Sequence, residues 1–192
     1  VFCLVTIKVS AIEKVILFGD SLMAGYGLPN EQHLSVVLQR SLEFDGHNIK
    51  IINGSVSGST SAGGLNIAEW TLSENNIDLM ILCLGANDML RGINPKETKN
   101  NLEEIIQIAK NKNIKVIIAG MIAPTSYGFA YKKSFDKIFS DLSKKHKLQL
   151  IPFLLEGVAQ NPKFNLSDGM HPNDQGTIII GNTLKKAILE NL

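Results

Sequence analysis

Continuous apolar runs of strand length recur along the chain, and segments with helical periodicity lie between and after them. Because these runs have no polar face, they are typical of parallel strands that helices cover on both sides. The predicted strands are Val15–Phe18, Ile49–Ile52, Leu79–Leu84, Val116–Ala119 and Leu148–Ile151. The predicted helices are His33–Phe44, Ser61–Glu74, one that starts at Asn94, Tyr131–His146 and Pro172–Leu192.

The helix that starts at Asn94 has the clearest sequence signal. Asn94 suits the capping position, Pro95 the first helical position, and Glu97 the position three residues after the cap. One apolar stripe follows, at Leu102, Ile105, Ile106 and Ala109. Strand and helix alternate five times along the whole chain. This alternation predicts an α/β fold, a three-layer α/β/α sandwich with a five-stranded parallel sheet and right-handed crossovers.

The composition predicts one domain and no nucleic-acid partner. The 192 residues are 44% apolar, which suits one hydrophobic core, and no linker or repeat interrupts residues 12–192. A formal charge of +1 lacks the basic bias of nucleic-acid-binding proteins, so we expect no nucleic-acid partner. The basic run 144–147 fits a helix carboxyl end, and we expect His33, His47 and His146 at the surface or at helix ends. The sequence does not indicate an oligomeric state.

Residues 1–11 form the one segment outside this predicted domain. The run 1–9 is mostly apolar and is followed by Ser10 and Ala11, as at the cleavage site of a secretory signal, although Lys8 interrupts it. The run is too short to span a bilayer. We interpret residues 1–11 as the remnant of a signal peptide, which predicts a periplasmic or secreted protein, with a cytoplasmic one as the alternative. The two cysteines, Cys3 and Cys83, provide no disulfide framework and no zinc spacing.

Polar residues follow three of the predicted strands. Ser21 comes after the first strand, Gly58 after the second and Asn87 after the third, and a polar group at 168–173 precedes the last helix. Ligands bind beyond the carboxyl ends of the strands in an open parallel sheet. We therefore expect all four groups to meet at one edge.

Three of these residues suit nucleophilic catalysis. Pro172 at the first position of the last helix would leave His171 on the loop before it. Asp168, three residues earlier, can reach Nδ1 of the ring and leave Nε2 to accept a proton from Ser21. The order Ser, Asp, His is one of several that produce a working triad.

An oxyanion site and an acyl pocket complete the prediction. The N–H groups of Ser21 and Gly58 and the side-chain amide of Asn87 are candidate donors to a developing oxyanion. Five residues on nearby loops either line an acyl pocket or belong to the core: Met89, Leu90, Tyr127, Phe129 and Met170.

Four segments resemble the sequence blocks of the SGNH (GDSL) hydrolases: GDSLMAGYGL, NGSVSGST, GANDMLRG and DGMHPN. The resemblance covers the chain from Val15 onward and is nearest to small bacterial arylesterases and multifunctional thioesterase, protease and lysophospholipase enzymes. It implies a flavodoxin-like SGNH hydrolase fold without cofactor or metal, which cleaves carboxylic esters or thioesters through an acyl-enzyme. The family's functional residues fall on Ser21, Gly58, Asn87, Asp168 and His171. The chain departs at Ser59, where relatives often carry an acidic residue.

Two alternatives remain at this point. A carbohydrate acetylesterase of the same family has the same motifs. A flavodoxin-like binding domain also gathers Gly- and Ser-rich loops at strand ends, but no GxGxxG or GxxxxGK[ST] motif follows a strand here.

Overall fold

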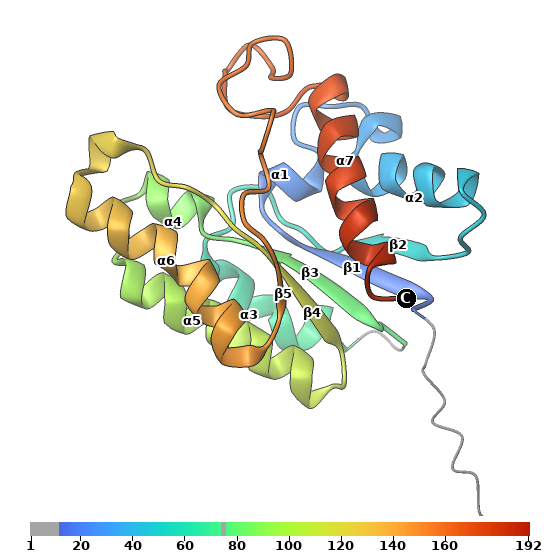
Figure 1. The fold of residues 1–192 in the computed structure, drawn as a ribbon, viewed down its shortest axis with the longest axis horizontal. Coiled ribbons are helices and arrows are strands. Elements are labelled where there is room, and N and C mark those ends of the chain that lie inside the picture. Colours follow the sequence, from blue (N-terminus) through green and yellow to red (C-terminus); the bar gives the residue numbers. More distant parts are fainter. Residues whose placement is uncertain (1–11, 74–75) are drawn as a thin grey trace, which may run out of the picture.

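The computed structural model describes residues 12–73 and 76–192, which form a five-stranded parallel sheet with helices on both faces (Figure 1). The strands are β1 (Lys14–Gly19), β2 (Lys50–Asn53), β3 (Leu79–Cys83), β4 (Lys115–Ala119) and β5 (Gln149–Ile151). Their order in space is β2-β1-β3-β4-β5, and every pairing is parallel. The predicted sheet is therefore confirmed. The predicted signal remnant, residues 1–11, lies outside the described residues.

The helices fall into two groups. They are α1 (Ser21–Ala24), α2 (Leu34–Phe44), α3 (Ser61–Thr71), α4 (Ala86–Leu90), α5 (Pro95–Asn111), α6 (Phe129–His146) and α7 (Asp174–Leu189). In Figure 1, α2 and α7 lie side by side over one face, while α3, α5 and α6 cover the other. The strand order explains this division, because the chain steps from β1 to β2 in one direction and from β2 onward in the other. Crossovers of one hand then place their helices on opposite faces.

The central strands are buried and the outer ones are half exposed. All five residues of β3 are inaccessible, whereas β2 and β5 keep partly exposed side chains. Burial on both faces, which we expected of every strand, is thus wrong for the two edges, where one neighbouring strand is missing. At the β2 edge the side chain of Gln39 takes the place of that strand. Its amide nitrogen donates to the carbonyl of Ile49, and its oxygen accepts from the N–H of Ile51.

Helix boundaries follow the capping residues. Asn94 caps α5 as predicted, since its side-chain oxygen accepts from the N–H of Lys96. The last helix differs from the prediction. It begins at Asp174, and Asn173 is its N-cap, accepting from the N–H of Gly176, so Pro172 lies before the cap and outside the helix.

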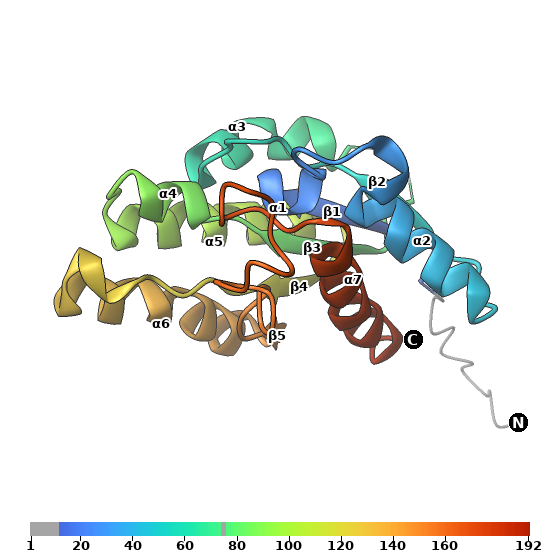
Figure 2. The ribbon, with the colours of Figure 1, turned by 90° about the horizontal axis from the view of Figure 1, so that it is seen from above.

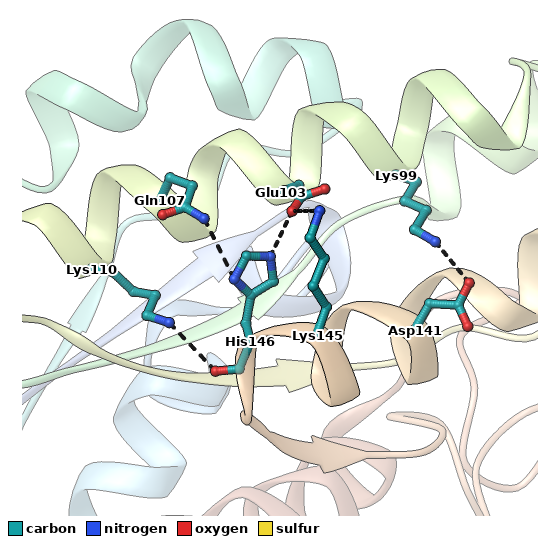
Figure 3. A network of polar contacts seen from close by, with 7 residues as sticks. All are labelled: Lys99, Glu103, Gln107, Lys110, Asp141, Lys145 and His146. Atoms are coloured by element: carbon teal, nitrogen blue, oxygen red, sulfur yellow. Dashed lines mark hydrogen bonds and ion pairs between the residues drawn. The ribbon is translucent and has the colours of Figure 1, made fainter.

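A polar network joins α5 to α6 (Figure 3). His146 ends α6, as predicted, and its side chain is 6% exposed. Its Nε2 atom lies 2.7 Å from Oε1 of Glu103, which also pairs with Lys145 at 2.6 Å. The hydrogen bond from Lys145 lowers the pKa of Glu103, with a smaller effect from His146. One turn along, Lys99 pairs with Asp141 at 2.7 Å.

Candidate active site

The carboxyl edge of the sheet gathers the four polar segments. Ser21 begins α1 directly after β1, Gly58 lies beyond β2, and Asn87 is in α4 beyond β3. His171 comes from the loop between β5 and α7, which passes beside α1 in both ribbon views (Figures 1 and 2). The sequence-predicted segments therefore meet at one place.

The turn from β1 into α1 depends on a glycine and an aspartate. A Cβ atom on Gly19 would lie 2.6 Å from the carbonyl oxygen of Cys83 and 2.7 Å from the side chain of Met23. Only glycine therefore lets α1 fold back so close to β3. Asp20 caps α1, because its side chain accepts from the N–H of Leu22 at 3.1 Å. This turn holds Ser21 at the first helical position.

Ser21, His171 and Asp168 form a chain of two hydrogen bonds with the imidazole in the middle. The Oγ atom of Ser21 is 3.0 Å from Nε2 of His171, and Nδ1 of the same ring is 2.7 Å from Oδ2 of Asp168. A carboxylate is a hydrogen-bond acceptor, so Nδ1 carries a proton and donates to it. Nε2 is then free to accept from the serine hydroxyl.

The loop around Asp168 holds the imidazole in place. Oδ1 of Asp168 accepts from the N–H groups of Met170 at 2.8 Å and His171 at 2.9 Å. These bonds, that of the His171 N–H first, lower the pKa of Asp168 to about 2. An antiparallel bridge between Asn165 and Pro172 closes the loop. The predicted cause of the His171 position, a helix that begins at Pro172, is thus replaced by a side-chain turn and a bridge.

Tyr26 contacts the imidazole ring of His171, a contact that the sequence analysis missed. Its ring centroid lies 4.4 Å from that of His171, with an angle of 37° between the planes. Gly25 and Gly27 flank it, both with positive φ, so the loop after α1 turns back over the imidazole. An aromatic residue between two glycines next to the serine was the available signal.

The three predicted oxyanion donors come from three segments, Ser21 at the start of α1, Gly58 in the loop after β2 and Asn87 in α4. Gly58 is the third residue of a turn closed by the Ser59 N–H and the Val56 carbonyl, and its φ of 79° favours glycine. The side chain of Asn87 reaches from α4 and donates one N–H to Oδ2 of Asp20 at 3.4 Å. Among the described residues its other N–H has no partner, so it can donate to a substrate oxygen.

Because residue 59 is a serine and not an acidic residue, other hydrogen bonds hold the Gly58 loop. Its hydroxyl donates to the carbonyl of Thr60, and Arg91 donates to the carbonyl of Gly58 at 3.1 Å. The loop is therefore held from α4 and by its own turn.

Asp20 is a buried acid beneath the site. Burial raises its pKa to about 6, against the hydrogen bonds from Leu22 and Asn87, which lower it. Its contact with Asn87 orients the amide so that nitrogen, and not oxygen, faces the site. The sequence did not predict this contact between Asp20 and Asn87.

A cavity of about 950 Å³ opens beside Ser21. Three of the five predicted pocket residues line it: Met89, Leu90 and Met170. Two do not, since Tyr127 packs against Tyr131 and the Phe129 side chain is 81% exposed at the start of α6. The cavity extends past the ends of β4 and β5 instead, along Met121, Ile122, Pro124, Phe153 and Leu155. These residues lie within five positions after the ends of β4 and β5. The same position after a strand predicted the polar site residues, and it could have predicted these apolar ones.

Within the described residues, no group of three or more His, Cys, Asp or Glu side chains could hold a metal ion. The thiol of Cys83 is buried at the end of β3, and burial raises its pKa. None of the described helices is long and apolar enough to cross a membrane.

Comparisons with known proteins give one family. Residues 17–177 match the GDSL-like lipase/acylhydrolase family, and this span contains all the predicted triad and oxyanion residues. The chain is 35% identical over 191 residues to an arylesterase of Vibrio mimicus, covering 100% of this chain and 95% of the relative. It is 30% identical to thioesterase 1/protease 1/lysophospholipase L1 of Escherichia coli K12, covering 96% and 88%. The crystal structure of TesA has a TM-score of 0.88 at 32% identity, covering 94% of this chain and 100% of that one.

Proposed function

The chain belongs to the GDSL-like lipase/acylhydrolase family, and from that premise we propose that it hydrolyses carboxylic esters and thioesters with Ser21 as the nucleophile. One observation carries the proposal. Ser21, His171 and Asp168 are joined by contacts of 3.0 Å and 2.7 Å at the wall of an open cavity. A serine hydroxyl next to an oriented imidazole is the arrangement that acyl transfer requires.

Acylation begins with attack of Ser21 Oγ on the carbonyl carbon of the substrate. His171 Nε2 takes the hydroxyl proton, and Asp168 stabilises the imidazolium through Nδ1. The negative charge that develops on the carbonyl oxygen is stabilised by the N–H groups of Ser21 and Gly58 and the amide of Asn87. The carbon–oxygen or carbon–sulfur bond then breaks, and His171 gives its proton to the leaving alcohol or thiol.

Deacylation repeats the same steps with water. His171 accepts a proton from a water molecule, whose oxygen attacks the acyl carbon of the ester on Ser21. The bond to Ser21 Oγ breaks, and the proton returns from His171 to that oxygen. The product is a carboxylic acid, and the enzyme is restored without any cofactor.

The cavity favours acyl groups longer than acetyl. Beyond β4 and β5 its lining is mainly apolar and also includes Lys132, Glu156 and Gln160, and its volume of about 950 Å³ greatly exceeds that of an acetyl group. A carbohydrate acetylesterase would fill this space with the sugar of its substrate instead of with an acyl chain. A panel of p-nitrophenyl esters and acyl-CoA thioesters tests this preference. Their acyl chains should span about two to sixteen carbons, a range of sizes that a pocket of this volume can distinguish. A maximum of kcat/KM at acetyl would reject the longer-chain assignment.

The serine assignment is tested by substitution. Ser21→Ala should lower kcat by at least about a thousandfold and abolish covalent labelling by a fluorophosphonate. Ser140→Ala, which removes a hydroxyl in α6 outside the cavity lining, is the control and should keep both labelling and turnover. Full labelling of Ser21→Ala would reject Ser21 as the nucleophile.

We also propose that residues 12–192 act as one domain and that the protein is exported to the periplasm or secreted. The second proposal rests on the apolar segment 1–9 and the small residues after it. Fractionation of the cells that naturally produce the protein tests export, because a remnant of a signal does not direct export by itself, and protein confined to the cytoplasm of those cells would contradict the proposal.

A further inference from the structure

Asp88 is a buried carboxylate next to a predicted oxyanion donor. It follows Asn87 in α4, and its side chain is fully inaccessible to solvent. A buried carboxylate needs hydrogen-bond donors, and Asp88 receives them from two other elements. Oδ2 accepts from the N–H of Ser61 at 2.7 Å, and Oδ1 accepts from the hydroxyl groups of Ser61 at 2.5 Å and Thr98 at 3.1 Å.

The Ser61 hydroxyl has a fixed direction. Asn101 donates its amide N–H to Ser61 Oγ at 3.0 Å, so this oxygen is an acceptor from α5 and a donor to Asp88. Ser61 is the first residue of α3 and lies three residues after Gly58. Both polar groups of Ser61 therefore hold the start of α3 against the carboxylate of Asp88.

A second side chain from the same region reaches the Gly58 loop. Arg91, which directly follows α4, donates to the carbonyl of Gly58 at 3.1 Å. The segment 58–61 is thus held at its first residue by Arg91 and at its last residue by Asp88. Asn87 lies in the same five-residue helix as Asp88. Helix α4 therefore carries one oxyanion donor and also holds the segment that carries Gly58.

We propose that Asp88 is a positioning residue that, through Ser61, sets the Gly58 N–H and the Asn87 amide at the separation an oxyanion requires. The inference rests on the proposed function, because it gives those two groups a common task. The two donors follow different strands, β2 and β3, which are not neighbours in the sheet. Both strands pair with β1, so the sheet sets the separation of the two donors through an intervening strand, and the contact between the loops adds a direct restraint.

Small displacements matter at such a site. Oxyanion donors act at about 2.7–3.1 Å from the oxygen, and loss of one donor typically lowers kcat by about a hundredfold or more. An asparagine at position 88 keeps the shape of the side chain but turns one acceptor oxygen into an N–H donor. At the Oδ2 position that donor would face the Ser61 N–H, which can only donate, and at the Oδ1 position the Ser61 hydroxyl would have to turn from donor to acceptor. The start of α3 and the Gly58 loop would then move away from Asn87.

The experiment compares four substitutions in the full chain, three at Asp88 and its partners and one at Arg91. Asp88→Asn and Ser61→Ala change the contact between α4 and the Gly58 segment. Thr98→Val is the matched control, since it removes a hydroxyl that contacts the same carboxylate from α5 and leaves the Ser61 contacts intact. Arg91→Met, at an exposed position, loosens the other end of the segment without opening the core. For each variant, kcat and KM on a p-nitrophenyl ester are measured, with inhibition by an alkylboronic acid, whose tetrahedral adduct places an oxygen where the oxyanion forms.

We expect Asp88→Asn and Ser61→Ala to lower kcat by about tenfold to a hundredfold and to weaken the boronic acid by a similar factor. KM should change little, because the ground-state ester does not need the oxyanion site. Arg91→Met should lower kcat by about threefold to tenfold, and Thr98→Val by less than about threefold. A Thr98→Val defect as large as that of Ser61→Ala would make Asp88 a merely structural group and overturn the proposal.

Two further results separate the failures. If Asp88→Asn does not fold, Ser61→Ala and Arg91→Met decide, and normal kcat in both overturns the proposal. Fluorophosphonate labelling of Ser21 distinguishes failure of the positioning role from failure of the proposed function. Normal kcat in folded Asp88→Asn with labelled Ser21 rejects the positioning role only, whereas unlabelled Ser21 in the unsubstituted protein rejects the proposed function itself.

Discussion

Two histidines of this chain pair with a carboxylate at the same distance, and their surroundings differ. In the candidate active site, Nδ1 of His171 lies 2.7 Å from Asp168 and Nε2 faces the hydroxyl of Ser21. Between α5 and α6, Nε2 of His146 lies 2.7 Å from Glu103, and Nδ1 lies 3.5 Å from the amide nitrogen of Gln107 (Figure 3). The partners require a proton on Nδ1 of His171 and on Nε2 of His146.

The difference shows what turns a histidine–carboxylate pair into a catalytic unit. His171 presents an unprotonated nitrogen to a hydroxyl at a cavity wall, so a proton can be transferred as substrate reacts. The corresponding nitrogen of His146 meets an amide, which does not give up its proton, and the ring is enclosed by two helices. Glu103 is further shared with Lys145, as expected of an ion-pair network that holds two helices together.

The largest expected effect separates the two histidines by activity. His171→Ala should lower kcat on a p-nitrophenyl ester by about a thousandfold or more, because Ser21 loses its base. His146→Ala should keep the turnover of the folded protein within about twofold, while its loss of packing and of the Glu103 contact lowers the free energy of unfolding by about 2 kcal/mol. Initial rates and urea unfolding measure both quantities. A comparable loss of kcat in His146→Ala would remove the distinction between the pairs.

A smaller effect is expected when the carboxylates are exchanged for amides. Asp168→Asn should lower kcat by about a hundredfold to ten-thousandfold, since an amide no longer fixes the proton on Nδ1 or stabilises the imidazolium. Glu103→Gln should leave kcat within about twofold, because that pair contacts no reacting atom. Steady-state kinetics at neutral pH decide the matter. Unchanged kcat in Asp168→Asn would assign the orientation of His171 to the Tyr26 contact in its place.

How far the sequence predicts this molecule depends on the range of each contact. The strands, the capped helix at Asn94 and the meeting of four polar segments follow from local patterns and from the rule for parallel sheets. The difference between His171 and His146 does not, because both stand near a helix end and the carboxylate of His146 lies 43 positions away in the sequence. The role of Ser61 and the contact of Asp20 with Asn87 likewise join distant segments. The prediction that Tyr127 and Phe129 line the pocket was wrong for a related reason. Their position in a loop near the cavity does not determine which way their side chains point.

The smallest expected effect concerns acid stability, where the two pairs should behave alike. The pKa of Asp168 falls from 3.8 to about 2 in the folded protein, and that of Glu103 is also lowered. A lowered folded-state pKa contributes stability that is present above the unfolded value of 3.8 and is lost as the pH falls through about 2. The Asp168 side chain is 39% exposed, so solvent screening keeps its contribution to about 1 kcal/mol or less.

Urea unfolding between about pH 5 and pH 2.5 measures this contribution. The difference in unfolding free energy between the unsubstituted protein and Asp168→Asn should shrink steadily as the pH falls, and Glu103→Gln should show the same direction. A difference that stays constant over this range would mean that Asp168 keeps its ordinary pKa and that its hydrogen bonds from Met170 and His171 do not favour the charged form. Agreement in sign between the two pairs would show that their electrostatics are alike. The capacity for catalysis then has to come from what each imidazole faces on its other side, a serine hydroxyl in one case and an amide in the other.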